Sequence, residues 1–156
     1  MTTTHASDRI DPSAMARMSG AQLDQLFRDS PPGPIPAGRS RGTAILVPGS
    51  PLDRAISALV RALVWKGKIF SSATGDLKNR IGPLGTPLIR ARVYQDQSWF
   101  SQGPAIILDY SKTSLLARMI RDEIRQVAPG IYLGQVYWGK KRIAHFMLEF
   151  PNSGTA

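Results

Sequence analysis

The stretch VYWGKKRIAHFMLEF, residues 136–150, is the part of the sequence that decides the fold. Gly139 and two lysines separate a first run, which ends in aromatic residues, from a second run of mainly apolar residues. This pattern predicts a hairpin of two antiparallel strands, because glycine suits the tight turn between them. In the second strand His145 lies on one face, and Phe146 and Leu148 lie on the opposite, more apolar face. The surroundings of His145 therefore depend on which face turns inward.

Further short strands are expected upstream of this hairpin. Runs rich in apolar and β-branched residues, bounded by glycine or proline, predict strands. They cover residues 43–47, 67–72, 75–82, 88–95 and 105–110, with another short strand about Trp99 and Phe100. The first strand of the hairpin itself covers residues 131–138. About seven strands with tight connections favour a strongly curved antiparallel sheet that closes, or nearly closes, into a small barrel. An α+β sheet with one open face is the alternative.

Two or three helices are expected to flank the sheet. Residues 21–30 carry apolar side chains at helical spacing. Residues 50–64 combine a capping serine and a proline with a long apolar stripe. Apolar residues of 115–127 also repeat with a helical period, up to the Pro129-Gly130 pair. We interpret the three apolar stripes as surfaces that pack against the sheet.

The composition is that of one folded domain. The chain has 156 residues, 42% hydrophobic and 20% charged, and it lacks cysteine, which excludes disulfides, thiolate nucleophiles and cysteine-ligated metals. No apolar run approaches the ~20 residues that span a bilayer, and no secretory signal is visible. We expect a cytoplasmic protein with one domain, residues 20–151, between a flexible N-terminal tail (1–19) and a short C-terminal tail (152–156).

The net charge of +9 favours anionic partners in general. The basic residues are spread along the chain, however, and residues 140–142 form the one basic run. A soluble, self-repelling surface explains this distribution better than a nucleic-acid interface does. Nucleic acid is therefore not the expected partner, and the oligomeric state stays open.

The N-terminal half contains a resemblance to a known family. LDQLF (23–27), a Pro-rich step and GRSRG (38–42) are similar to the start of small bacterial lipocalin-like proteins of uncharacterised function, whose hallmark is Gly-x-Trp-x-Gly. Gly38 and Gly42 match that motif, but Ser40 stands in the place of its tryptophan. The resemblance implies a small barrel that binds apolar ligands. The predicted fold is thus mainly β (α+β): a small antiparallel, closed or nearly closed, lipocalin-like barrel with two or three flanking helices.

One predicted strand carries the first candidate site. Arg90, Arg92 and Tyr94 share a face, and two guanidiniums and a phenol can bind a carboxylate or phosphate by charge-assisted hydrogen bonds. Fatty-acid-binding barrels are similar in using an Arg-x-Tyr element for a carboxylate, which implies that role for Arg92 and Tyr94. If this face turned outward instead, the alternate residues Ile89, Ala91 and Val93 would lie in the core.

His145 and Asp109 are the candidate catalytic residues. If the His145 face turned inward, the imidazole could serve as a general acid or base. Asp109 precedes a predicted strand-to-helix junction, together with Lys112. The other histidine is His5, in the predicted tail, and no phosphate-binding loop, dinucleotide fingerprint or His-Glu-x-x-His occurs. We therefore expect no metal and no cofactor.

These patterns favour a barrel that encloses an apolar or amphipathic, neutral or anionic, lipid-like small molecule. Arg90, Arg92 and Tyr94 would hold its polar end, and Trp99, Tyr132 and His145 would line the lumen. The alternative is a barrel enzyme, an isomerase, cyclase or lyase with scattered acid–base residues. A third possibility is a binder of nucleic acid or of an anionic surface. The sequence does not decide between binding and catalysis.

Overall fold

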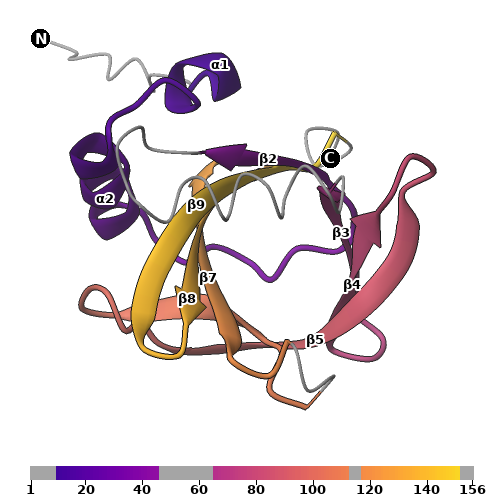
Figure 1. Ribbon diagram of the computed structural model, residues 1–156. Helices are drawn as coiled ribbons and strands as arrows, with labels where there is room; N and C mark the ends of the chain where they lie inside the picture. Colours follow the sequence, from indigo (N-terminus) through magenta and orange to yellow (C-terminus); the bar gives the residue numbers. More distant parts are fainter. Residues whose placement is uncertain (1–9, 46–64, 113–116, 152–156) are drawn as a thin grey trace, which may run out of the picture.

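The computed structural model describes residues 10–45, 65–112 and 117–151, which form two short helices and nine strands (Figure 1). The helices are α1 (Pro12–Met15) and α2 (Gly20–Asp29). The strands are β1 (Gly38–Arg39), β2 (Arg41–Ile45), β3 (Trp65–Ser71), β4 (Asp76–Ile81), β5 (Thr86–Gln97), β6 (Pro104–Asp109), β7 (Ile120–Ala128), β8 (Ile131–Trp138) and β9 (Lys141–Glu149).

The nine strands form one antiparallel sheet that curves into a nearly closed barrel, as predicted. Their order in the sheet is β1-β3-β4-β5-β6-β7-β8-β9-β2, and Figure 1 shows them arranged in a ring. Ser40 alone separates the two edge strands, so one continuous stretch of chain pairs with β3 first and with β9 next. This stretch joins the two edges of the sheet, which removes most of the unpaired backbone that an open sheet would expose.

Ser40 and Gly67 make the closure between β1, β2 and β3. The Ser40 amide donates to the carbonyl oxygen of Lys68 over 2.9 Å, and the Lys68 amide donates to Ser40 Oγ over 3.0 Å. Gly67 lies at a bulge of β3 with φ +138, and a Cβ there would lie 2.3 Å from the Ser40 carbonyl oxygen. The close backbone approach therefore requires glycine at position 67. Ser40 therefore has a structural role at this closure.

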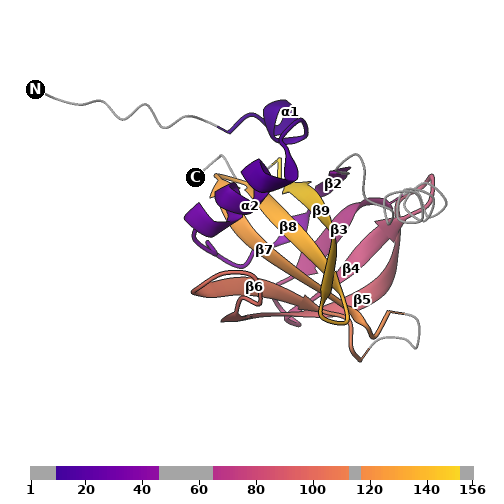
Figure 2. The ribbon, with the colours of Figure 1, turned by 60° about the vertical axis from the view of Figure 1, so that its left-hand side comes forward.

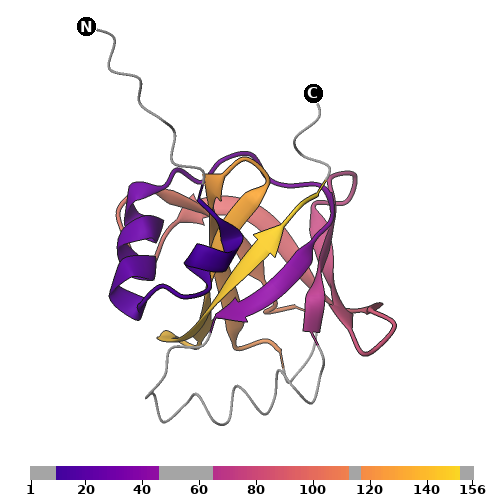
Figure 3. The same cartoon turned by 90° about the horizontal axis from the view of Figure 1, so that it is seen from above.

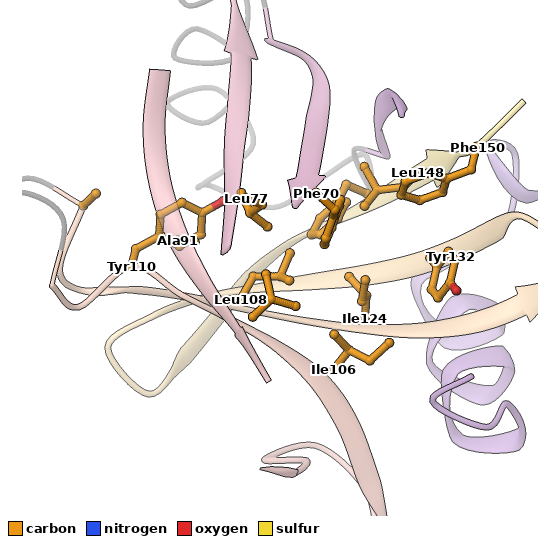
Figure 4. Close-up of a cluster of buried hydrophobic side chains, with 13 residues drawn as sticks. Phe70, Leu77, Ala91, Ile106, Leu108, Tyr110, Ile124, Tyr132, Leu148 and Phe150 are labelled. Atoms are coloured by element: carbon orange, nitrogen blue, oxygen red, sulfur yellow. The ribbon is translucent and has the colours of Figure 1, made fainter. Parts of the chain in front are cut away.

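The inner face of the barrel carries the larger apolar cluster, called the inner core. Figure 4 draws its buried residues as sticks and labels ten of them, with Tyr110 toward one end and Tyr132 and Phe150 toward the other. Its buried residues are Phe70, Leu77, Ala91, Val93, Ile106, Leu108, Tyr110, Ala117, Ile124, Tyr132, Phe146, Leu148 and Phe150. The alternation of the closing hairpin thus directs Phe146 and Leu148 inward, and His145 outward.

Helices α1 and α2 cover part of the outer face, beside β7, β8 and β9 (Figures 2 and 3). The predicted helix at 21–30 is confirmed as α2, whose N-terminus is capped reciprocally by Ser19 and Gln22. Leu23 and Phe27 are fully buried in an outer cluster with Ile107, Leu133 and others. Met15 of α1 is also fully buried there, so part of the predicted N-terminal tail packs on the barrel.

The predicted helix at 115–127 is wrong over its described part. Residues 120–128 form β7 between β6 and β8, with Ile124 inward and Arg125 outward. Apolar residues in this segment fit both a helical and a two-residue period, and pairing on both sides outweighs the local helical preference. The Pro129-Gly130 pair consequently forms the β7–β8 turn instead of a helix end, with Gly130 at φ +72.

The predicted short strand about Trp99 and Phe100 is also wrong, because these residues belong to the loop between β5 and β6. Glu123 on the outer face of β7 holds this loop. Its carboxylate accepts from the Trp99 amide over 2.6 Å and from Ser98 Oγ over 2.9 Å. The Trp99 amide is thereby used by a side chain and cannot serve a strand ladder.

Several predictions lie outside the described residues, namely the helix at 50–64, residues 46–47 of the first strand, Leu115 and Leu116, and the outer parts of both tails. Within the described ranges, no helix combines the length and the apolarity needed to cross a membrane.

Candidate functional site

A cavity of about 220 Å³ lies at one end of the barrel. Its walls come mainly from apolar side chains of the inner face and of the adjoining hairpins, and five polar residues border it. The lining residues are Ala44, Trp65, Lys68, Asn79, Ile81, Ile89, Tyr110, Ala117, Ile120, Asp122, Val136, Trp138, Ile143, Ala144, His145 and Phe146. Trp138 and Ile89 are 49% and 41% exposed, so the cavity reaches the surface of the molecule near them. The other end of the barrel is filled by the inner core.

The polar cluster, defined as Lys68, Asn79, Tyr110 and Asp122, borders this cavity. Its residues come from β3, β4, the end of β6 and β7, and each is almost fully buried. The Lys68 ammonium donates to Tyr110 Oη over 2.6 Å, to Asn79 Oδ1 over 2.8 Å and to Asp122 Oδ2 over 3.2 Å. Three acceptors thus satisfy the three protons of one buried cation.

Asn79 connects the cluster to the barrel wall. Its amide donates to Tyr110 Oη over 2.8 Å and to the carbonyl oxygen of Ile89 over 3.0 Å, and its Oδ1 accepts from Trp65 Nε1 over 3.2 Å. Ile89 is the extra residue of a bulge between β4 and β5 and has φ +49, a region that β-branched residues avoid. The strained backbone of Ile89 thus supplies an acceptor for Asn79, which supports a preorganised site.

The electrostatics of the cluster favour a neutral Tyr110 beside a charged Lys68. Burial opposes the charge of Lys68, but the attraction of Tyr110 and Asp122 outweighs it and raises the pKa of the ammonium. Burial raises the pKa of the Tyr110 hydroxyl, so it keeps its proton at neutral pH. Burial also raises the pKa of Asp122, against the opposing effects of Lys68 and of hydrogen bonds from Lys68 and Tyr110. The contact with the Lys68 ammonium at 3.2 Å stabilises the carboxylate form of Asp122, and burial opposes it.

One acceptor at the cavity has no partner within the described part of the chain. Asp122 Oδ2 accepts from Lys68, whereas Oδ1 of the same carboxylate is buried and accepts no hydrogen bond. A buried carboxylate oxygen without a partner is costly, and a bound water, ion or ligand donor can satisfy such an atom.

The predicted anion-binding face points away from this cavity. Arg90 and Arg92 are exposed, whereas Ala91 and Val93 from the same strand lie in the inner core. Tyr94 packs against the outer cluster, and its hydroxyl donates to Asp109 over 2.9 Å. The two arginines and the tyrosine therefore do not border the cavity.

Asp109, Trp99 and Tyr132 lie at three separate places. Asp109 is on the outer face of β6, where it also accepts from the Ser111 amide over 2.9 Å. Trp99 is half-exposed on the outside and packs edge-on against Tyr137. Tyr132 belongs to the inner core at the filled end, and its hydroxyl donates to the carbonyl oxygen of Pro34 over 2.7 Å. Of these three residues, Tyr132 alone faces the interior, and none borders the cavity.

His145 borders the cavity, but its imidazole contacts α2 on the outer face. Nε2 lies 3.1 Å from Oδ1 of Asp24, which also accepts from Nη1 of Arg142 over 2.7 Å. Burial, followed by the charge of Arg142, lowers the pKa of His145, and Asp24 opposes this change. The sequence-predicted candidates are therefore not brought together in one site.

This arrangement predicts that acid weakens the protein through His145. Because its folded pKa lies below the unfolded value of about 6.5, its stabilising contribution is complete above that value and is lost as the pH falls through the folded pKa. We expect the melting temperature to fall less between pH 7 and pH 5 in His145→Gln than in the wild type. NMR titration should place the His145 pKa below 6.5, and assignment is simple because the chain has two histidines. A pKa above 6.5 would contradict this arrangement.

The polar cluster was missed by sequence reasoning, although part of its signal is visible. Lys68 is two residues from Phe70, Asn79 is two residues from Leu77, and Tyr110 is two residues from Leu108, so each polar residue shares a strand face with an apolar one. A polar residue in line with the apolar face of a strand indicates a buried polar position. The signal for Asp122 was hidden, because its segment was interpreted as a helix. In the described ranges, no group of three histidine, cysteine, aspartate or glutamate residues could hold a metal ion.

Comparison with known proteins supports the fold alone. No family model matches the sequence, and no curated protein matches it either. The structure is similar to a crystal structure described as a protein from Thermomonospora curvata, with a TM-score of 0.62 and 20% sequence identity. The similarity covers 88% of this chain and 90% of the other. The chain therefore shares a nearly closed antiparallel β-barrel with that protein.

Proposed function

We propose that this barrel binds a small amphipathic molecule, with its apolar body in the cavity and its polar end at the polar cluster. The observation that carries the proposal is the cavity itself, in which apolar walls from several strands meet the four residues of the polar cluster. Such a combination is typical of small-molecule sites. The resemblance of residues 38–42 to lipocalin-like barrels supports the same function.

The volume limits the size of the ligand. About 220 Å³ is less than the roughly 300–1,000 Å³ of pockets for drug-sized molecules. An apolar cavity of about 150 Å³ can hold benzene. The described cavity therefore suits one or two fused rings, or a short branched chain, with one polar group.

We expect the wild-type protein to bind a small aromatic molecule such as indole saturably. In ¹H–¹⁵N NMR titrations the shifts should be confined to amides of the cavity-lining strands. Ala44→Phe should weaken this binding at least tenfold, because Ala44 borders the cavity and the added ring would occupy it. A melting curve of the apo variant checks that it still folds.

Arg92→Ala is the matched control, since Arg92 is exposed on the outer face. It should leave the affinity for indole unchanged. Shifts spread over the whole surface, or binding that Ala44→Phe leaves intact, would contradict the proposed site.

Proton transfer on the bound molecule is a second candidate function. Lys68, Tyr110 and Asp122 favour it, because three titratable side chains meet beside one cavity. Tyr110, whose pKa burial raises, would act as the acid rather than as the base. An isomerisation that Tyr110→Phe abolishes while indole binding persists would support an enzyme. The same turnover in Tyr110→Phe would exclude this role.

A further inference from the structure

We propose that the ligand presents a neutral hydrogen-bond donor, an N–H or O–H group, to Oδ1 of Asp122, and that the site discriminates against carboxylates. This inference rests on the proposed function, because it assigns the chemical class of the molecule in the same cavity. It differs from the sequence-based expectation, in which arginine side chains would bind an anionic end.

The N–H donors of the cluster are already in use. The three protons of Lys68 go to Tyr110, Asn79 and Asp122. The two protons of the Asn79 amide go to Tyr110 and to the carbonyl oxygen of Ile89. The Tyr110 hydroxyl accepts from both Lys68 and Asn79, and its interaction with Asp122 lowers the pKa of that carboxyl against the effect of burial. An acceptor on the ligand would have to displace one of these bonds.

The spare capacity of the cluster is an acceptor. Asp122 Oδ1 is buried, belongs to a residue that borders the cavity, and accepts no hydrogen bond from the described residues. A ligand donor placed against it would satisfy a charged acceptor in a low-dielectric site, where such bonds are strongest. The carboxylate therefore selects a donor.

The charge of the polar cluster also favours a ligand with a neutral hydrogen-bond donor. Lys68 and Asp122 form an ion pair at 3.2 Å, with side chains 4% and 5% exposed. Their charges cancel locally, so the lysine is not available as a counter-ion for an anion. A carboxylate in the cavity would lie beside Asp122 and would have to lose its hydration without compensation.

The experiment compares three probes of similar size on the wild-type protein: indole, benzofuran and benzoate. Benzofuran has the shape of indole, but an oxygen replaces the N–H group. We expect indole to bind at least tenfold tighter than benzofuran, since hydrogen bonds to buried charged groups have effects of this order. Benzoate should be the weakest of the three.

Asp122→Asn provides the variant test. The amide oxygen remains the acceptor for Lys68, so an N–H group replaces Oδ1 and the local charge becomes positive. The preference for indole over benzofuran should fall to less than twofold, and benzoate should bind more tightly than it does to the wild type. If this variant does not fold, the ranking of the three probes on the wild type still decides the question.

The outcomes separate the two proposals. If benzofuran or benzoate binds as tightly as indole, and Ala44→Phe abolishes that binding, the cavity is a ligand site but the donor assignment is overturned. If no probe binds saturably, the proposed function itself is overturned. The expected ranking, together with its loss in Asp122→Asn, supports both.

Discussion

Asp122→Ala should lower the free energy of unfolding by about 3–5 kcal/mol, because it leaves the buried ammonium of Lys68 without its carboxylate. The Lys68 side chain is 4% exposed, so its ammonium is largely shielded from bulk solvent. Tyr110 and Asn79 still accept from the ammonium, but neither carries a compensating charge. Urea-induced unfolding at pH 7 measures the effect.

Two further variants test the reason for this loss. Lys68→Met combined with Asp122→Ala removes both charges and should recover most of the stability lost in the single variant. Arg90→Ala is the control, since it breaks an ion pair with Asp76 at 3.7 Å in which the arginine is 62% exposed. It should cost about 0–1 kcal/mol. A loss below about 1 kcal/mol for Asp122→Ala would show that the buried ammonium of Lys68 does not need Asp122 as its counter-ion.

Gly67→Ala should cost at least about 3 kcal/mol and open the junction between the two edges of the sheet. The backbone at this position has φ +138, which residues with a side chain rarely adopt. The new Cβ would also lie 2.3 Å from the carbonyl oxygen of Ser40, and a backbone atom in a paired strand cannot move aside easily. Denaturant unfolding measures the cost, and hydrogen exchange of the β1 and β3 amides reports the opening.

Gly75→Ala is the matched substitution. Gly75 also has a positive φ, +65, but a Cβ there would meet no atom within 4 Å. The expected cost is about 1–2 kcal/mol, which is the conformational penalty alone. Equal losses for the two variants would mean that the contact with Ser40 does not determine the closure.

Much of the barrel could be predicted from local patterns. Alternation in residues 136–150 predicted a hairpin with Phe146 and Leu148 on its more apolar face, but it left open which face turns inward, and the structure has these two residues in the inner core. Apolar runs bounded by glycine and proline likewise predicted most of the other strands. These signals are local, because side-chain alternation and turn geometry depend on a few neighbouring residues.

The conformation of residues 120–128 required the tertiary structure. Their apolar spacing allows a helix or a strand, and pairing with β6 and β8 decides for the strand. For the same reason, the sequence did not decide which face of β5 points inward. Either Arg92 or Ala91 could point inward until closure of the sheet defined an interior.

By itself, then, the sequence determined a mainly β chain with a closing hairpin, a short amphipathic helix at α2 and a strongly curved antiparallel sheet. The tertiary structure alone decided where the chemistry lies. Lys68 meets Asn79, Tyr110 and Asp122 across 11, 42 and 54 residues of sequence. No local pattern encodes such a meeting, because it depends on strand order and register around the whole barrel. His145, the residue that the hairpin made most conspicuous, instead holds α2 against the outer face through Asp24.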